Sequence, residues 1–262
     1  MPNSLRTFMQ YRLPATTLPV VRRWLSTAGR LLPGACALCA ATGPHVLCTG
    51  CRAQFFSSTS ARCSCCELPL RGASGPVALC GNCLCQPPAF DATVAVADYA
   101  APVDQLVLGL KFGAKLALAP LFSDLLREAM LGFAATGLSL PDCIAPVPLG
   151  RIRLQERGFN QALEIARPLS AMLGVPLMTG MLVRVRDTAA QTQLSPLARK
   201  RNLRGAFTLA PQMIDTLRGR HIGLVDDVMT TGATANELAA TLKRFGAARV
   251  TCLVVARTLP KY

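Results

Sequence analysis

The stretch HIGLVDDVMTTGATANE, residues 221–237, ends an apolar run with two adjacent carboxylates and follows them with a turn of small hydroxyl residues. Asp226 and Asp227 close the run, and Gly232 permits close backbone approach within the turn. The turn leads into a helical pattern, so backbone N–H groups and the positive end of a helix dipole favour a phosphate there. The two acids favour instead the paired hydroxyls of a ribose, or Mg²⁺. We therefore interpret the stretch as a site for a sugar phosphate that carries a vicinal diol.

The alternative interpretation is a plain strand end followed by a capped helix. The stretch is neither the G-x-x-x-x-G-K-[ST] loop of nucleoside triphosphatases nor the G-x-G-x-x-G dinucleotide motif. However, an acidic pair together with a threonine–glycine turn is more than a helix cap requires. The sequence therefore favours a ligand over a cap.

Strand and helix patterns alternate on both sides of this stretch. Helical apolar spacing recurs in the segments 102–112, 116–131, 158–173 and 233–246. Near-continuous apolar or β-branched runs, typical of strands, occur at 91–99, 142–149, 180–186, 221–227 and 249–257. Such alternation predicts an α/β fold, with a parallel sheet covered by helices on both faces.

Ligands in such sheets bind beyond the carboxyl ends of the strands. We expect the acidic pair, the segment PVPL (146–149), Arg184 and Arg186 to lie at these ends. The sequence therefore predicts that these groups share one site.

The N-terminal third is rich in cysteine, with ten of the twelve cysteines between Cys36 and Cys85. Two thiolates separated by two residues can grip one tetrahedral Zn²⁺, and two such pairs complete a closed site. Four C-x-x-C pairs therefore predict two structural zinc ions, although buried free thiols or disulfides are the alternative. Sequential pairing places Cys36, Cys39, Cys48 and Cys51 at one zinc and Cys63, Cys66, Cys80 and Cys83 at the other, and interleaved pairing stays open.

Cys65 and Cys85 lie one or two residues from proposed ligands. Three roles stay open for them: spare cysteines, alternative ligands or redox-sensitive thiols. His45 is a candidate replacement ligand at the first site, with a lone surface histidine as the simpler interpretation. The sequence does not decide among these roles.

The composition is that of a globular protein, with 262 residues, 51% hydrophobic and 16% charged. A formal net charge of +14 favours polyanionic partners such as phosphorylated small molecules or nucleic acid. No apolar run approaches the roughly 18–20 residues of a membrane span, and no secretory signal pattern is present, so we expect a cytoplasmic protein.

Three regions follow from these patterns. Residues 1–33 form a basic lead-in, interpreted as a short amphipathic helix, with an organellar transit peptide as the alternative. Residues 34–88 form the cysteine-rich module, and residues 89–262 form the α/β domain.

The acidic-pair motif resembles that of the type I phosphoribosyltransferases, which bind 5-phosphoribosyl-1-pyrophosphate (PRPP). The wider chain resembles the ComF family of competence-associated proteins, which joins a double zinc ribbon to a phosphoribosyltransferase-like domain. Besides the cysteine pairs and the acidic pair, the resemblance rests on LKF (110–112), PVPL, RGFNQA (157–162), RVRDTAAQTQL (184–194) and RKRNLRGAF (199–207).

This resemblance implies roles for individual residues. Asp226 and Asp227 would bind the ribose hydroxyls, and Lys111 falls where these folds place a pyrophosphate-binding loop. Residues 187–195 resemble the flexible loop that closes over the site. The 5-phosphate would be bound by Thr230, Thr231, Gly232, Ala233 and Thr234.

The chain departs from the family pattern in one respect. Zinc ribbons commonly place glycine after the second cysteine of a pair, where this chain has Ala40, Arg52, Glu67 and Leu84.

The resemblance leaves three functional hypotheses. The first is a phosphoribosyltransferase that uses PRPP and Mg²⁺, releases pyrophosphate and has an unidentified acceptor. The second is a PRPP-binding protein without turnover that serves DNA uptake in natural competence, together with DNA-uptake proteins. The third is a zinc-ribbon protein that binds single-stranded DNA, with the phosphoribosyltransferase-like domain as a scaffold or sensor. Arg151, Arg153 and Arg157 are candidates to neutralise pyrophosphate, with a solvated basic surface as the alternative. RKRNLR (199–204) is a phosphate-facing helix, a nucleic-acid patch or an ordinary charged face.

Overall fold

The structure is a computed structural model that describes residues 34–57, 60–70, 78–186 and 203–260. The predicted lead-in over 1–33 and the predicted closing loop over 187–195 lie outside the described residues, as does most of the basic run 199–204. Among the described residues, none of the helices combines the length and the apolar character that a bilayer crossing requires.

The described part of the chain divides into two compact units, with the boundary between Cys48 and Thr49. In the first unit, β1 (Gly34–Ala35) pairs antiparallel with β2 (Thr42–Gly43). The hairpin encloses the first C-x-x-C pair. The predicted region boundaries after residues 33 and 88 stay predictions.

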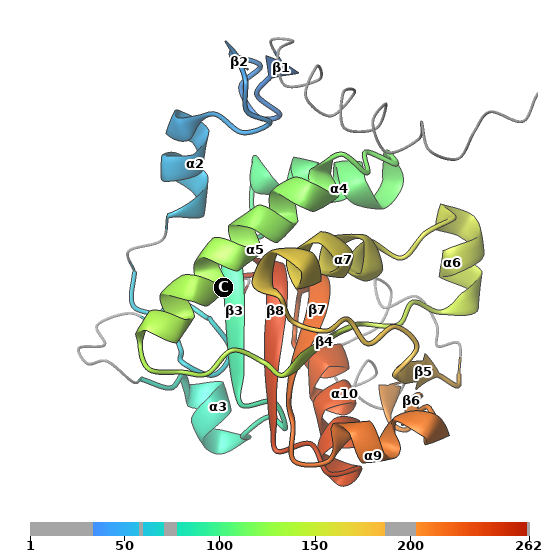
Figure 1. Ribbon diagram of the computed structural model, residues 1–262. Coiled ribbons are helices and arrows are strands. Elements are labelled where there is room, and N and C mark those ends of the chain that lie inside the picture. The colour runs from blue at the N-terminus through green and yellow to red at the C-terminus, as the bar shows by residue number, and fades with distance from the viewer. Residues whose placement is uncertain (1–33, 58–59, 71–77, 187–202, 261–262) are drawn as a thin grey trace, which may run out of the picture. The chain divides into compact units, whose positions relative to one another are not determined.

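A four-stranded parallel sheet forms the centre of the second unit, as the alternating pattern predicted (Figure 1). The two central strands are almost wholly buried, which explains why their sequences read as continuous apolar runs. The strand order is β3 (Ala92–Asp98), β8 (Arg249–Arg257), β7 (His221–Met229) and β4 (Cys143–Pro146).

Helices cover both faces of this sheet, which confirms the predicted fold class. The helices α5 (Leu118–Ala135) and α7 (Gln161–Leu173) pack on one face, and α10 (Ala233–Arg244) packs on the other (Figure 1). The remaining helices of the described chain are α2 (Thr49–Phe56), α3 (Gly81–Cys85), α4 (Val103–Phe112), α6 (Arg151–Arg157), the 3₁₀ turn η2 (Pro211–Met213) and α9 (Ile214–Leu217).

The segment 180–186, predicted as a strand of the parallel sheet, lies elsewhere. Its strand β5 (Leu182–Arg184) pairs antiparallel with β6 (Phe207–Leu209) in a separate two-stranded sheet. The expectation that Arg184 and Arg186 follow a strand of the parallel sheet is therefore wrong. The physical reason is burial: Val183 and Val185 are 42% and 54% exposed, whereas a parallel strand is covered on both faces.

Candidate functional site

A cavity of about 660 Å³ opens beyond the carboxyl ends of β7 and β4. Its walls come from α4, α6, the start of α7, the end of β7 and the start of α10. Segments that are far apart in the sequence, from Tyr99 to Val254, thus meet around one cavity. The lining includes seven of the eight residues proposed for PRPP: Lys111, Asp226, Asp227, Thr230, Gly232, Ala233 and Thr234. Thr231 is the exception, and its side chain is exposed beside them.

The two acids are held in different environments at the end of β7. Asp227 is 7% exposed, and its Oδ1 lies 3.0 Å from Nζ of Lys111. Asp226 is half-buried, and its Oδ1 accepts a hydrogen bond of 2.9 Å from the backbone N–H of Asp227. Loss of hydration, and then the neighbouring Asp227 carboxylate, raise the pKa of Asp226 to about 7. The pair can therefore change its charge near neutral pH.

Lys111 lies in the last turn of α4 and not in a loop. The helix ends beyond it at Gly113, whose N–H donates to the Gly109 carbonyl at 3.0 Å. Apolar spacing explains the position, because the helix buries Leu106, Val107 and Leu110 against the core while Lys111 faces the cavity. The ammonium is thereby fixed beside the acidic pair.

The hydroxyl turn changes chain direction at Gly232, which has φ of +77° and precedes the first residue of α10. An L side chain is strained in this left-handed conformation, so glycine fits the position. The Thr231 hydroxyl oxygen accepts from the N–H of Ala233 at 3.3 Å, and the Gly232 carbonyl accepts from the N–H of Asn236 at 2.8 Å. The start of α10 lies at the wall of the cavity, because Gly232, Ala233 and Thr234 line it.

Three arginines, Arg153, Arg157 and Arg184, line the same cavity. The guanidinium of Arg157 lies 4.9 Å from the centre of the Phe112 ring and donates to Gln161 Oε1 at 3.0 Å. Burial lowers its pKa from the usual arginine value. Arg151 is not among the lining residues.

Arg153 and Arg157 were candidates from the sequence, but the helix α6 that carries them was not predicted. Charged residues alternate through RIRLQER, and the helix buries none of its residues, so no apolar stripe marks it. Gly158, with φ of +76°, ends the helix, and this glycine is the signal that was available. Asn160 then caps α7 and donates to the Val147 carbonyl at 3.0 Å, which ties RGFNQA to PVPL.

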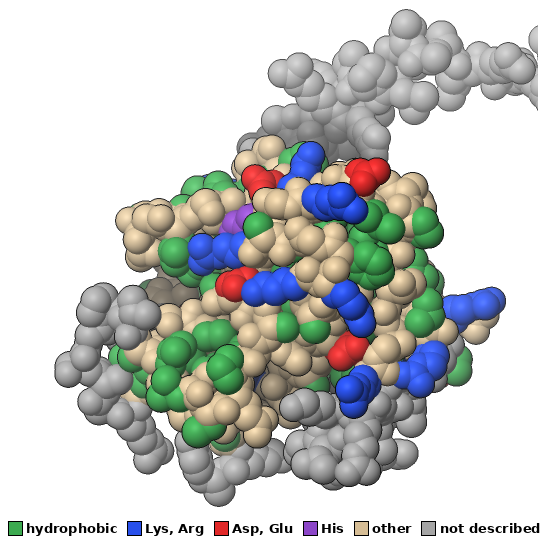
Figure 2. Space-filling view, turned by 90° about the horizontal axis from the view of Figure 1, so that it is seen from below, with side chains coloured by type: hydrophobic (Ala, Val, Ile, Leu, Met, Phe, Trp, Pro, Cys, Tyr) green, Lys and Arg blue, Asp and Glu red, His purple; other side chains and the backbone are tan. Residues whose placement is uncertain are grey.

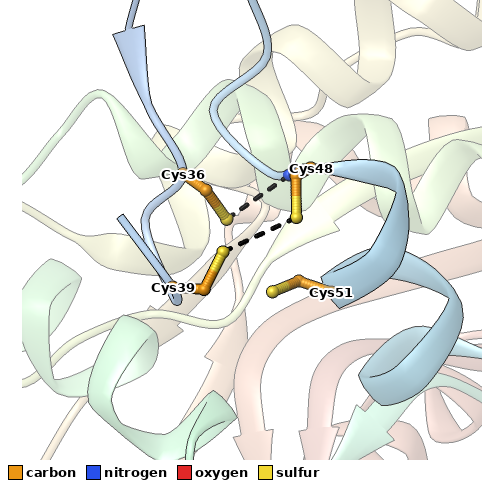
Figure 3. A group of neighbouring side chains, drawn as sticks. All are labelled: Cys36, Cys39, Cys48 and Cys51. Atoms are coloured by element: carbon orange, nitrogen blue, oxygen red, sulfur yellow. Dashed lines mark hydrogen bonds between the residues drawn. The ribbon is translucent and has the colours of Figure 1, made fainter. Parts of the chain in front are cut away.

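The first group of cysteines is compact (Figure 3). The sulfurs of Cys36, Cys39, Cys48 and Cys51 all lie within 4.8 Å of one another. The Cys39 and Cys48 sulfurs are 3.7 Å apart, and the backbone N–H of Cys48 donates to the Cys36 sulfur at 3.4 Å (Figure 3). Zn–S bonds of about 2.3 Å in a tetrahedron place sulfurs roughly 3.8 Å apart, so this donor set fits zinc.

The second group repeats this geometry inside the core of the second unit. Its members Cys63, Cys66, Cys80 and Cys83 again lie within 4.8 Å of one another, which groups the pairs sequentially. The Cys66 and Cys80 sulfurs are 3.6 Å apart, and the Cys80 N–H donates to the Cys63 sulfur at 3.3 Å. Cys63 is fully buried, and the group packs in the same hydrophobic cluster as Phe90 and Met229. These four residues also fit zinc.

Two of the four residues that replace the knuckle glycines keep the glycine conformation. Ala40 has φ of +59° and Glu67 has φ of +60°. Their N–H groups donate to the Cys36 and Cys63 carbonyls, at 2.9 Å in both cases. These two knuckles therefore keep the left-handed turn without glycine, whereas Arg52 and Leu84 lie within the helices α2 and α3.

The extra candidates lie outside the two groups. The Cys65 sulfur is buried and lies 3.7 Å from the Phe90 carbonyl, whereas Cys85 and His45 are exposed. Neither group of four includes any of these three residues.

The chain is similar in sequence to one domain family and to two named bacterial proteins. The phosphoribosyl transferase domain family matches residues 160–261. The DNA utilization protein YhgH of Escherichia coli K12 is 40% identical over 232 residues, covering 87% of this chain and 99% of that protein. Competence protein F of Haemophilus influenzae is 35% identical over 212 residues, covering 80% and 90% of the two chains. A glutamine PRPP amidotransferase structure from B. subtilis is 18% identical, covers 52% of this chain and 26% of that one, and has a TM-score of 0.34.

Proposed function

The chain belongs to the ComF family, which includes competence protein F and DNA utilization protein YhgH, and from this premise we propose that it binds PRPP in the cavity beside Asp226. One observation carries the proposal. The acidic pair, the Lys111 ammonium and four of the five residues of the turn 230–234 line a single cavity of about 660 Å³.

The chemistry of the lining matches the parts of PRPP. Carboxylates accept hydrogen bonds from a vicinal diol, and backbone N–H groups at the start of a helix such as α10 donate hydrogen bonds to a 5-phosphate. Arg153 and Arg157 supply positive charge for the pyrophosphate, on the α6 side of the same cavity. The proposed division therefore assigns the acids to the ribose, the turn to the phosphate and the cations to the leaving group.

The donor set also suits Mg²⁺, which prefers carboxylate and phosphate oxygens. Asp226 and Asp227 would hold the ion together with the ligand. When bound, it would neutralise pyrophosphate charge. The chain's own residues would orient the sugar and exclude water, as transfer through an oxocarbenium-like state at C1′ requires. The acceptor is unassigned. We therefore propose transfer of the phosphoribosyl group as a second step, which PRPP binding alone does not require.

The names of the relatives connect the family to competence and to DNA utilization. We extend this link to the present chain as part of the proposal. The protein would then serve DNA uptake or the use of the DNA taken up.

Calorimetry with PRPP, with and without Mg²⁺, tests the binding proposal. Binding that needs Mg²⁺ and is lost in Asp227→Asn supports it, because the variant keeps the shape of the side chain and removes its charge. Asp215→Asn is the matched control, because Asp215 is an exposed carboxylate on α9 and is not among the cavity residues. Unchanged PRPP affinity in Asp227→Asn would reject the assignment. Pyrophosphate release across a panel of bases then tests transfer.

A second candidate function is binding of single-stranded DNA, which the net charge of +14 favours. The face drawn in Figure 2 does not single out a basic surface, because Lys and Arg side chains are interspersed with Asp and Glu there. Salt-dependent DNA binding that survives Asp226→Ala and Asp227→Ala would support this function. Loss of DNA binding in these variants would assign the DNA to the cavity instead.

A further inference from the structure

We propose that Arg257 is a positioning residue that couples the second cysteine group to the turn 230–234, so that metal in that group raises affinity for PRPP. This inference rests on the proposed PRPP site and concerns its regulation. The second cysteine group is Cys63, Cys66, Cys80 and Cys83.

Arg257 is a buried cation at the end of β8. The residue is only 4% exposed, and its backbone pairs with Met229 on β7 and with Asp98 on β3. A charge in such a place needs polar partners, because burial removes its hydration. The partners of this guanidinium are backbone carbonyls.

These carbonyls belong to the two features that the proposal connects. Nε donates to the Cys66 carbonyl at 2.9 Å, within the second cysteine group. Nη1 donates to the Met229 carbonyl at 3.0 Å and to the Thr230 carbonyl, where the turn begins. It also donates to the Thr258 carbonyl at 3.0 Å. Because the guanidinium is planar and rigid, moving the Cys66 carbonyl moves the group that holds the turn.

Two further contacts join the same regions independently of Arg257. The backbone N–H of Ala89 donates at 2.7 Å to Oδ1 of Asn236, in the first turn of α10. The Phe90 ring lies beside Gly232, since a Cβ built on this glycine would be 3.7 Å from ring atoms. Phe90 in turn contacts the group's neighbour Cys65, with 3.7 Å between its carbonyl oxygen and the sulfur. The segment after the cysteines is therefore packed against the turn.

The metal would act through the position of one carbonyl. A Cys-x-x-Cys pair grips an ion from a single turn, and Cys66 is the second cysteine of its pair. When the metal fixes the Cys66 sulfur, the Cys66 carbonyl stays in position to accept the hydrogen bond from Arg257. By thermodynamic linkage, metal that favours PRPP binding must itself be retained more strongly when PRPP is bound.

The first test measures, at equilibrium, the competition for zinc between the full chain and a chromogenic chelator, with and without PRPP and Mg²⁺. We expect PRPP to raise the affinity for one zinc ion about tenfold, within the usual range of coupling between sites, and to leave the affinity for the other unchanged. Cys39→Ser weakens the first group alone and identifies which zinc ion belongs to which group.

The second test uses Arg257→Lys, which keeps the charge and removes the planar donor geometry. We expect PRPP affinity to fall about tenfold and the protection of zinc by PRPP to disappear. The matched control is Arg249→Lys, the same change at the opposite end of β8. If Arg257→Lys does not fold, the zinc-affinity test on the unmodified chain still decides whether the two sites are coupled.

The outcomes separate this inference from the proposed function. If PRPP binds the unmodified chain and leaves the affinity for both zinc ions unchanged, the coupling is wrong although the PRPP site stands. Full affinity and full zinc protection in Arg257→Lys would likewise overturn the role of Arg257. If PRPP does not bind the unmodified, zinc-loaded chain, the proposed function fails and the coupling fails with it.

Discussion

The Nζ of Lys111 in the last turn of α4 lies 3.0 Å from Oδ1 of Asp227 on β7. Both side chains are largely shielded from water, at 19% and 10% exposure. The ion pair therefore sits inside the cavity and not on the surface, where such pairs contribute little.

Replacing this lysine tests whether the ammonium belongs to the ligand site. We expect Lys111→Gln to lower the free energy of unfolding by about 1–3 kcal/mol, because it leaves a shielded carboxylate without its cation. PRPP affinity should fall as well, since the cavity loses a positive charge near the pyrophosphate. Lys115→Gln, at an exposed position four residues on, should change neither quantity. Denaturant unfolding and calorimetry measure both, and equal behaviour of the two variants would contradict the assignment.

The raised pKa of Asp226 predicts a pH dependence of stability. Its folded-state pKa of about 7 exceeds the usual aspartate value of 3.8, so the native state binds more protons than the unfolded state between these values. Stability should therefore fall as the pH rises from about 4 to 7.

Asp226→Asn should remove this loss of stability. We expect its melting temperature at pH 8 to exceed that of the unmodified chain by a few degrees, since about 1 kcal/mol corresponds to roughly 2–4 °C at this size. The same variant should bind PRPP poorly. Thermal unfolding at pH 5 and pH 8 checks the first part, and an equal melting-temperature difference at both pH values would refute the explanation.

Gly232 offers a test of the turn conformation. Gly232→Ala should cost about 1–2 kcal/mol of stability, because its φ of +77° is strained for any L side chain. The control is Gly219→Ala, since Gly219 has φ of +70° and open space around it, away from the cavity. Both variants should lose similar stability, and only Gly232→Ala should lose affinity for PRPP. Equal affinities in calorimetry would remove the turn from the site.

Ala40 allows a gain in metal affinity to be predicted. Its φ of +59° places a side chain where zinc ribbons commonly have glycine, so Ala40→Gly should relieve strain in the metal-bound knuckle. We expect zinc affinity at the first group to rise several-fold, since the strain is about 1–2 kcal/mol and glycine's entropy offsets part of it. Competition with a chelator measures the affinity. Ala41→Gly is the control, and a similar gain there would exclude relief of strain as the cause.

Zinc content provides the simplest prediction. Elemental analysis of protein purified under anaerobic reducing conditions should find about two zinc ions per chain, one for each closed group of four thiolates. Removing the metal should destabilise the cysteine-rich segments, because they are small and their folding depends on the bound ion. A zinc-free but fully folded preparation would contradict the structural role of the metal.

Much of this arrangement could be predicted from local patterns. The strands β7 and β8 are continuous apolar runs because both of their faces are buried, and the cysteine spacing indicated the knuckles directly. The hairpin of β5 with β6 was missed because a short apolar run has the same appearance in either kind of sheet. Helix α6 was missed because it buries nothing.

The hydrogen-bond partners of Arg257 could not be predicted from local sequence patterns. Its partners Cys66 and Met229 are 191 and 28 residues away along the chain, and no spacing rule connects such distances. The one available signal was a charged residue at the end of a strand whose remaining residues are mostly apolar. Buried hydrogen bonds of this kind become visible only when the fold is known.

The position of β8 has a consequence for synthesis. It is the last of the four strands along the chain, yet it lies between β3 and β7 at the centre of the sheet. On the ribosome, the cysteine pairs emerge early and can capture metal. The edges of β3 and β7 that pair with β8 stay unpaired until β8 is synthesised. A chain that stalls before residue 249 would thus hold zinc but lack a continuous sheet. Such a chain would be a natural substrate for chaperones and proteases.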